Sequence, residues 1–167
     1  GWFADRSTAK AGERLRDECG IGRDARVLLF AGRMVPFKRP FDVIEAAARC
    51  RLQGVAVEVM VAGDGELRSD VEMRAAQLQV PIHMLGFCNQ SRMPSVYAAS
   101  DALVLSSDGN ETWGLVANEA IACGRPVVVS TACGCAPDLA GTQAAASYPV
   151  GDVSALADVL TAILHKP

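Results

Sequence analysis

Short, continuous apolar runs alternate with longer segments of mixed polarity along the chain. Runs of this kind are typical of strands buried on both faces of a parallel sheet. They predict five strands, at 27–31, 55–62, 82–85, 102–105 and 126–130. A weaker sixth strand is predicted at 145–150.

The segments between these runs have the spacing of helices. They predict six helices, at 6–19, 39–52, 66–79, 90–99, 114–123 and 152–165. Pro40 suits a first helical turn, and Gly124 suits the end of a helix. Strands that alternate with helices through short connections form a parallel sheet covered on both sides. We therefore predict an α/β fold, a three-layer αβα Rossmann-like domain with a parallel sheet of about six strands.

The composition narrows the class of protein. The 167 residues fit one domain, and 50% of them are hydrophobic, which is enough for a full core. The net charge of -3 comes without a basic stripe, which argues against a nucleic-acid partner. No apolar run reaches the roughly 18 residues that a membrane span needs, and the first residues do not resemble a signal peptide.

The six cysteines lie mostly inside apolar runs, which favours a reduced, cytoplasmic setting. Peripheral contact with the inner face of a membrane stays open for the full-length protein. Cys133 and Cys135 are interpreted as structural thiols, with a zinc or redox site as the alternative. His83 lies on a predicted strand and is expected in the core. His165 lies near a helix end, where it suits the helix dipole.

Ligands of open α/β sheets bind at the carboxyl ends of the strands. The loops to consider therefore begin near Gly32, Gly63, Gly86, Ser106 and Thr131. The Gly63–Gly65 loop lacks the spacing of a dinucleotide fingerprint and is interpreted mainly as a turn.

The loop after the fourth strand leads into a helix start. Gly114 is the expected entry, so the amides of Gly114, Leu115 and Val116 should lack helical acceptors. Such an amide cluster favours an anion, most often a phosphate. The loop after the first strand carries Arg33 and Lys38, which suit phosphate oxygens but are also common in solvated loops. Together the two loops predict a diphosphate held from two sides.

Glu111 and Glu119 lie eight positions apart around this helix start. The helix is otherwise apolar and is expected to be buried, so Glu119 needs hydrogen-bond partners. Carboxylates beside an anion site suit the hydroxyls of a ribose or hexose, because they only accept hydrogen bonds. The alternative is that Glu111 caps the helix and that Glu119 pairs with an arginine.

The segment from Glu111 to Glu119, followed by Ala-Ile-Ala-Cys-Gly-Arg-Pro-Val-Val, resembles the E-x7-E segment of retaining GT-B glycosyltransferases. The GT4-type set, often labelled glycosyl transferases group 1, is the most similar group. The resemblance runs from about residue 12 to residue 164. Further blocks agree in order, at Phe30–Arg33 with Lys38, Val61–Gly65, Leu85–Phe87, Tyr97–Asp101 and Gly134–Asp138.

The resemblance implies a donor-binding role for ten residues. The diphosphate of a nucleotide-sugar would be bound by Arg33 and Lys38 in the Gly32 loop and by the amides of Gly114, Leu115 and Val116. The donated sugar would contact Glu111, the ribose would contact Glu119, and the base would lie near Phe87 and Cys88. Arg33, Lys38 and Glu111 would act on the reaction itself.

The resemblance also implies an activity and an organisation. A hexosyl group would move from a nucleotide-diphosphate sugar to an acceptor glycan, lipid or small molecule, with retention and without a metal or other cofactor. Residues 1–167 would form the donor-binding C-terminal half, and the N-terminal acceptor domain would be absent, so the chain alone should be nearly inactive. Two alternatives remain: a sugar-nucleotide epimerase of GT-B architecture, and a non-catalytic α/β module such as a receiver-like domain.

Overall fold

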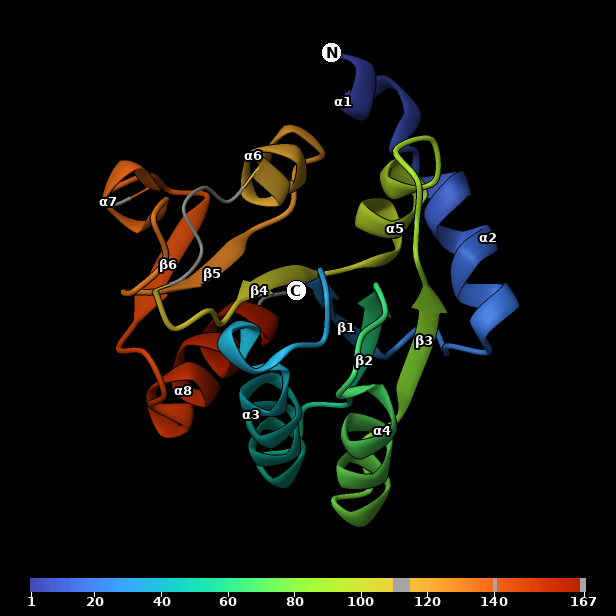
Figure 1. Cartoon of the computed structure of the whole chain (residues 1–167). Helices are drawn as coiled ribbons and strands as arrows, with labels where there is room; N and C mark the ends of the chain where they lie inside the picture. Colours follow the sequence, from blue (N-terminus) through green and yellow to red (C-terminus); the bar gives the residue numbers. More distant parts are fainter. Residues whose placement is uncertain (110–114, 140, 166–167) are drawn as a thin grey trace.

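Six parallel strands form one sheet in the order β3-β2-β1-β4-β5-β6 (Figure 1). The structure is a computed structural model that describes residues 1–109, 115–139 and 141–165. The strands are β1 (Arg26–Ala31), β2 (Val57–Ala62), β3 (Ile82–Gly86), β4 (Ala102–Leu105), β5 (Val127–Ser130) and β6 (Ala145–Tyr148). The predicted three-layer fold with about six parallel strands is therefore confirmed.

Helices cover both faces of the sheet (Figure 1). One face carries α3 (Pro40–Leu52), α4 (Arg68–Gln77) and α8 (Val153–Leu164). The other face carries α1 (Trp2–Arg6), α2 (Ala9–Cys19), α5 (Met93–Ala99), α6 (Leu115–Ala122) and α7 (Ala136–Leu139). A short 3-10 helix, η1 (Pro36–Lys38), lies in the loop between β1 and α3. No helix of the described residues is long and apolar enough to cross a membrane.

The continuous apolar runs have a direct explanation in β1. Leu28 and Phe30 belong to the core beneath α3, α4 and α8, whereas Val27 and Leu29 belong to the core beneath α2 and α5. Successive strand residues point to opposite faces, and both faces here are covered by helices. Alternation with polar residues is therefore absent.

Arg16 ties α2 to the amino edge of the sheet. Its guanidinium donates hydrogen bonds to the carbonyls of Ala99 and Ala25, at 2.9 and 3.1 Å, and to Asp101 at 2.8 Å. Asp101 also accepts the Val27 N–H at 2.8 Å. These bonds join α2 to the segments that enter β1 and β4.

The helix predicted at 6–19 is wrong in extent, because it begins at Ala9 and Arg6 belongs to the separate helix α1. The Thr8 hydroxyl accepts the Ala11 N–H at 3.1 Å and caps α2, which ends α1 at Arg6. A threonine side chain that satisfies a first-turn amide favours a helix start over a helix interior.

Other boundaries shift by a few residues. The strand predicted from Val55 starts at Val57. The helix predicted at 66–79 ends at Gln77, and Gln79 has a left-handed φ of 57°. The helix predicted at 90–99 starts at Met93, after a turn at Asn89. The short elements α1, η1 and α7 were not predicted, because none is long enough to give a periodic pattern.

Candidate functional site

The order of the sheet reverses between β1 and β4, and crevices at such a switch point bind ligands. A cavity with a volume of about 260 Å³ lies near this point, beside the carboxyl ends of β1, β2 and β3. It is lined by Ala31, Gly32, Arg33, Ala62, Gly63, Asp64, Phe87, Cys88, Met93, Val116 and Glu119. We call it the β1–α6 cavity.

The loops after β1 and β2 run together beyond the strands. The Gly32 N–H donates to the Ala62 carbonyl at 3.0 Å, and the Met34 N–H donates to the Asp64 carbonyl at 2.9 Å. A Cβ atom on Gly63 would lie 1.9 Å from the carbonyl oxygen of Gly32, so only glycine fits there. Gly63 is therefore part of the wall of the cavity, and the interpretation of this loop as mainly a turn was incomplete.

Ser106, the residue that follows β4, holds the loop that carries Lys38. The buried Ser106 hydroxyl contacts the carbonyls of Lys38 and Arg39, at 2.6 and 3.0 Å. Arg39 has a left-handed φ of 49° and contacts Asp42 at 2.7 Å. That hydrogen bond and the charge of Asp42 raise the pKa of Arg39. These contacts fix the direction in which the Lys38 side chain leaves the loop.

Lys38 and Arg33 both lie at the β1 end of the cavity. The Lys38 Nζ lies 3.6 Å from the position that a Cβ on Gly32 would occupy, so the side chain folds over Gly32. Arg33 lines the cavity and is exposed, and no hydrogen bond or ion pair to another described residue is seen. The predicted pair of cations is therefore located at the cavity.

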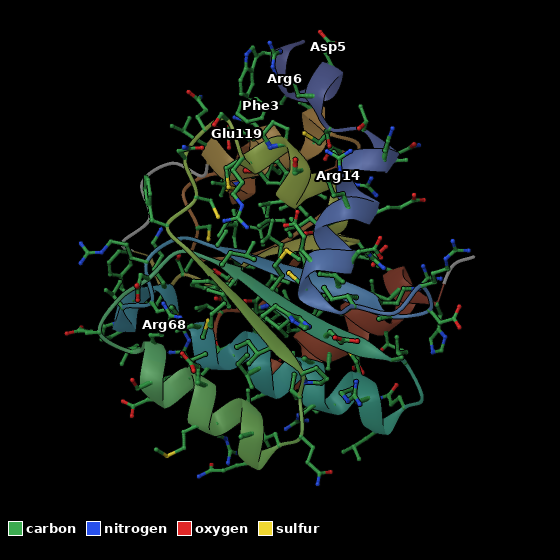
Figure 2. The ribbon with its side chains drawn as sticks, turned by 90° about the vertical axis from the view of Figure 1, so that its right-hand side faces the viewer. Phe3, Asp5, Arg6, Arg14, Arg68 and Glu119 are labelled. Atoms are coloured by element: carbon green, nitrogen blue, oxygen red, sulfur yellow. The ribbon has the colours of Figure 1, made fainter. Side chains whose placement is uncertain are left out.

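The described carboxylates that line the cavity already have donors. Asp64 accepts the Gly65 N–H at 2.8 Å and contacts Arg68, which is labelled in Figure 2, at 3.3 Å. Glu119 accepts a hydrogen bond from Tyr97. Because the cations Arg33 and Lys38 both lie at the β1 end of the cavity, that end can attract an anion.

The helix α6 points its amino end toward the cavity. It begins at Leu115, which is 63% exposed, and Val116 lines the cavity. The first amides of an α-helix lack intrahelical acceptors. The prediction that the helix is buried all round is wrong, because only the face that includes Ala117 and Ala120 packs on the sheet.

Glu119 is held by Tyr97 rather than by an arginine in the described part of the chain. The buried Tyr97 hydroxyl donates to Glu119 Oε1 at 2.7 Å. Burial and this hydrogen bond raise the pKa of Tyr97, so the phenol stays protonated and remains a donor. The expectation that Glu119 needs a partner is confirmed. The alternative of an arginine partner is not supported, because the partner among the described residues is Tyr97.

Phe87 and Cys88 follow β3 at the edge of the cavity. Phe87 is 84% exposed. Large apolar side chains that are exposed in this way often belong to binding surfaces. The Cys88 thiol donates to the Gly86 carbonyl at 3.6 Å, and burial raises the pKa of Cys88. The thiol is therefore neutral near pH 7, which suits a packing role rather than a nucleophile.

The outcome differs among the ten predicted site residues. Six line the β1–α6 cavity: Gly32, Arg33, Phe87, Cys88, Val116 and Glu119. Lys38 folds over Gly32, and Leu115 is exposed at the start of α6 without lining the cavity. Glu111 and Gly114 lie outside the described residues.

Four residues considered from the sequence lie outside the cavity. His83 is half-buried and its Nε2 lies 2.8 Å from a Glu58 oxygen, so the expected core position is wrong. His165 lies at the C-cap position of α8, so its predicted place near a helix end is confirmed, and its interaction with the helix dipole stays a prediction. Cys133 and Cys135 are both buried, which agrees with a structural role. Within 1–109, 115–139 and 141–165, no cluster of His, Cys, Asp or Glu could hold a metal ion, and the need for a metal stays untested.

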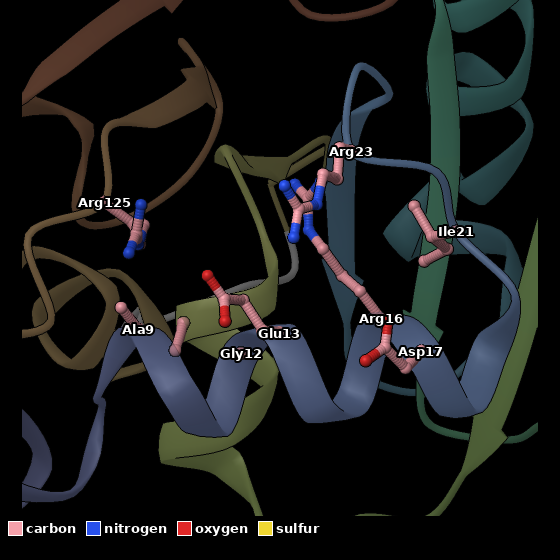
Figure 3. Close-up of a pocket in the computed structure, with 9 residues that line it drawn as sticks. Ala9, Gly12, Glu13, Arg16, Asp17, Ile21, Arg23 and Arg125 are labelled. Carbon is pink, nitrogen blue, oxygen red and sulfur yellow. The ribbon is translucent and has the colours of Figure 1, made fainter.

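A larger cavity of about 400 Å³ lies at the opposite edge of the sheet (Figure 3). Its lining comes from α2, from Ala98 in α5 and from the segments that enter β1 and β5. Arg16 in this cavity is already bonded to three acceptors. Glu13 and Asp17 line it together with Arg23 and Arg125, so its charged groups are of both signs. We therefore prefer the β1–α6 cavity, because parallel sheets bind ligands at their carboxyl edge.

Several contributors to the site escaped the sequence interpretation, and three of them carry side-chain chemistry or packing. Asp64 and Met93 line the cavity, and Tyr97 holds Glu119. Asp64 was visible only as part of a turn and of the Val61–Gly65 block, and Tyr97 only as part of the Tyr97–Asp101 block. The pairing of Tyr97 with Glu119 depends on how α5 packs beside α6, which neither segment encodes alone.

The chain matches the family described as "Glycosyl transferases group 1" over residues 12–167. It is 37% identical over 137 residues to the D-inositol 3-phosphate glycosyltransferase of Geodermatophilus obscurus, covering 75% of this chain and 30% of that protein. The chain therefore spans less than a third of the length of this curated relative.

Two solved structures share the fold. Anabaena Alr3699/HepE in complex with UDP-glucose has a TM-score of 0.83 and 25% identity, covering 95% of this chain and 44% of that chain. The C-terminal domain of the glycosyl transferase group 1 protein LpcC from Francisella tularensis has a TM-score of 0.78 and 22% identity, with coverage of 93% and 83%. These matches exclude a receiver-like module. The chain belongs to the glycosyl transferases group 1 family and has the Rossmann-like fold of GT-B glycosyltransferases.

Proposed function

We propose that this chain is the C-terminal, donor-binding half of a retaining, GT4-type glycosyltransferase. The observation that carries the proposal is the β1–α6 cavity, where Arg33, the Lys38 loop and the start of α6 meet. The acceptor would bind mainly to a preceding domain, and the whole enzyme would transfer a hexose in glycan or glycolipid synthesis. The names of HepE with UDP-glucose and of the inositol phosphate glycosyltransferase support a nucleotide-sugar donor.

The proposed donor lies across the cavity with its diphosphate at the β1 end. Arg33 and Lys38 bind the phosphates from one side, and the amides of Leu115 and Val116 bind them from the other. The base stacks against the exposed Phe87 ring beside Cys88, because an exposed aromatic face suits stacking. Glu119 accepts a hydrogen bond from the ribose, and Glu111, outside the described residues, is assigned to the donated sugar.

The chemistry follows from the charge of the leaving group. Breaking the glycosyl–phosphate bond leaves negative charge on the diphosphate, where the two cations and the helix amides act. Preorganised donors placed where charge develops are among the largest contributions to catalysis. We assign no residue as a covalent nucleophile, so the departing phosphate is proposed to take the proton of the acceptor hydroxyl. This route needs no metal, and that part stays a prediction.

A thermal-shift screen of the 167-residue chain tests the proposal. Ligands that bind only the folded state raise the melting temperature according to their affinity. We expect UDP or GDP, and their sugar conjugates, to raise it more than the corresponding nucleosides, with the shift unchanged by EDTA. An equal shift from nucleosides, or none from any diphosphate, would contradict the diphosphate site.

The Glu119→Gln substitution tests the ribose assignment. The change keeps the size of the side chain and removes its charge, so a charge-assisted hydrogen bond to a ribose hydroxyl should weaken. We expect calorimetry to give a loss of about 1–2 kcal/mol for the ribonucleotide and a smaller loss for its 2′-deoxy analogue. Equal losses for both ligands would remove the assignment.

A further inference from the structure

The hydroxyl of Tyr97 lies behind the β1–α6 cavity rather than on its surface. Tyr97 is 0% exposed, and its Oη donates a 2.7 Å hydrogen bond to Oε1 of Glu119. Glu119 lines the cavity, whereas Tyr97 does not. The phenol therefore contacts the carboxylate from the protein side, and the carboxylate lies between the phenol and the cavity.

The N-terminal helix α1 supports the phenol from behind. The Phe3 ring meets the Tyr97 ring edge to face, with centroids 6.2 Å apart. Figure 2 shows Phe3 and Glu119 at the same end of the molecule, where α1 packs beside α5 and α6. This contact, the burial of Tyr97 and its hydrogen bond to Glu119 together hold the phenol in place.

The hydrogen bond from Tyr97 restricts the Glu119 side chain before a ligand binds. A free glutamate side chain samples several rotamers and loses that freedom when it binds a ligand. A carboxylate whose one oxygen is already held presents the other oxygen in a fixed direction. The raised pKa of Tyr97, caused first by burial, keeps the hydroxyl a donor at neutral pH and above.

We propose that Tyr97 is a positioning residue, whose hydroxyl holds one oxygen of Glu119 so that the other accepts a hydrogen bond from the ribose of a nucleoside diphosphate. The inference rests on the proposed function and adds a determinant of the preference for ribose over deoxyribose. Tyr97 achieves this without touching the ligand.

The chain offers a matched control for removing this hydroxyl. Tyr148 is also buried, at 1% exposed, and its hydroxyl has no hydrogen-bond partner in the described ranges. Tyr97→Phe and Tyr148→Phe therefore make the same chemical change in the core. Only the first removes a hydrogen bond to a residue of the cavity.

The affinities of both variants of the 167-residue chain are measured by calorimetry with UDP, GDP and their 2′-deoxy analogues. Tyr97→Phe should weaken the bound ribonucleotide about three- to tenfold and its 2′-deoxy analogue less than about twofold, as expected for one hydrogen bond. Tyr148→Phe should change neither. In the Glu119→Gln background, Tyr97→Phe should add less than in the wild-type background, because the two residues act as one unit.

The outcomes separate this inference from the proposed function. If the wild-type chain binds neither UDP nor GDP, the proposed function fails and the role of Tyr97 falls with it. If it binds one of them and Tyr97→Phe leaves the ratio of ribose to deoxyribose affinity unchanged, only the role of Tyr97 is overturned. Full additivity with Glu119→Gln would also overturn it.

A measurement on the unsubstituted fold covers the case in which Tyr97→Phe does not fold. The chain has two tyrosines, so 3-fluorotyrosine labelling gives two fluorine resonances, and Tyr148→Phe assigns them. The bound ribonucleotide should shift the Tyr97 resonance and leave that of Tyr148 in place. Its 2′-deoxy analogue should shift the Tyr97 resonance less. An unmoved Tyr97 resonance would contradict the proposal.

Discussion

Lys38→Ala should weaken the binding of a nucleoside diphosphate by about 1–3 kcal/mol, which is about five- to 150-fold in affinity. The Lys38 ammonium folds over Gly32, at the β1 end of the cavity, and its loop is tied to β4 through Ser106. A charge-assisted hydrogen bond to phosphate is lost in the variant, whereas the backbone that positions the loop is kept. Calorimetry on the isolated chain measures the change.

Lys10→Ala provides the control for a general effect of charge. Lys10 is exposed on α2, which packs at the opposite edge of the sheet. Both variants change the net charge equally, so a difference between them reports the position of the charge. The phosphate role is contradicted if Lys38→Ala keeps the wild-type affinity, or if Lys10→Ala loses as much.

Gly63→Ala should lower the free energy of unfolding by about 3–5 kcal/mol, which places it among the severe single substitutions. A Cβ on Gly63 would lie 1.9 Å from the Gly32 oxygen, and its φ of 153° is one that side chains rarely adopt. The clash is with backbone, so the loops after β1 and β2 would have to separate. In a domain of this size the melting temperature should fall by on the order of 10 °C.

Gly22→Ala is the matched control for this change. No atom lies within 4 Å of the Cβ position on Gly22, so its melting temperature should stay near that of the wild type. Differential scanning calorimetry compares the two variants. A Gly63→Ala variant that melts with the wild type would mean that the two loops do not approach as described.

The fold could be predicted because its strongest signals are local. The β1 run from Val27 to Ala31 is apolar on both faces, and both faces are covered by helices. The meeting of the Gly32 loop with the start of α6 also followed from general rules, because the carboxyl ends of parallel strands share one edge. Arg33 and Lys38 were therefore predicted at the right edge of the sheet, where Arg33 lines the cavity and Lys38 folds over Gly32 beside it.

The parts of the site that could not be predicted depend on contacts between segments that are distant in the sequence. The close approach of Gly63 to Gly32 follows from the register that pairs Ala31 with Ala62, which no single segment encodes. The partner of Glu119 depends on the packing of α5 against α6, so Tyr97 was not assigned to it. The exposure of Leu115 was missed because an apolar helix start was assumed to pack against the sheet.

The central claim is that a nucleoside diphosphate binds at the β1–α6 cavity. Nuclear magnetic resonance of the ¹⁵N-labelled chain, titrated with the diphosphate that gives the largest thermal shift, tests it residue by residue. The account predicts that the amide signals of Gly32, Arg33, Gly63 and Val116 move together and saturate. Signals that move instead around Gly12 and Arg125, in the larger cavity of Figure 3, would contradict it.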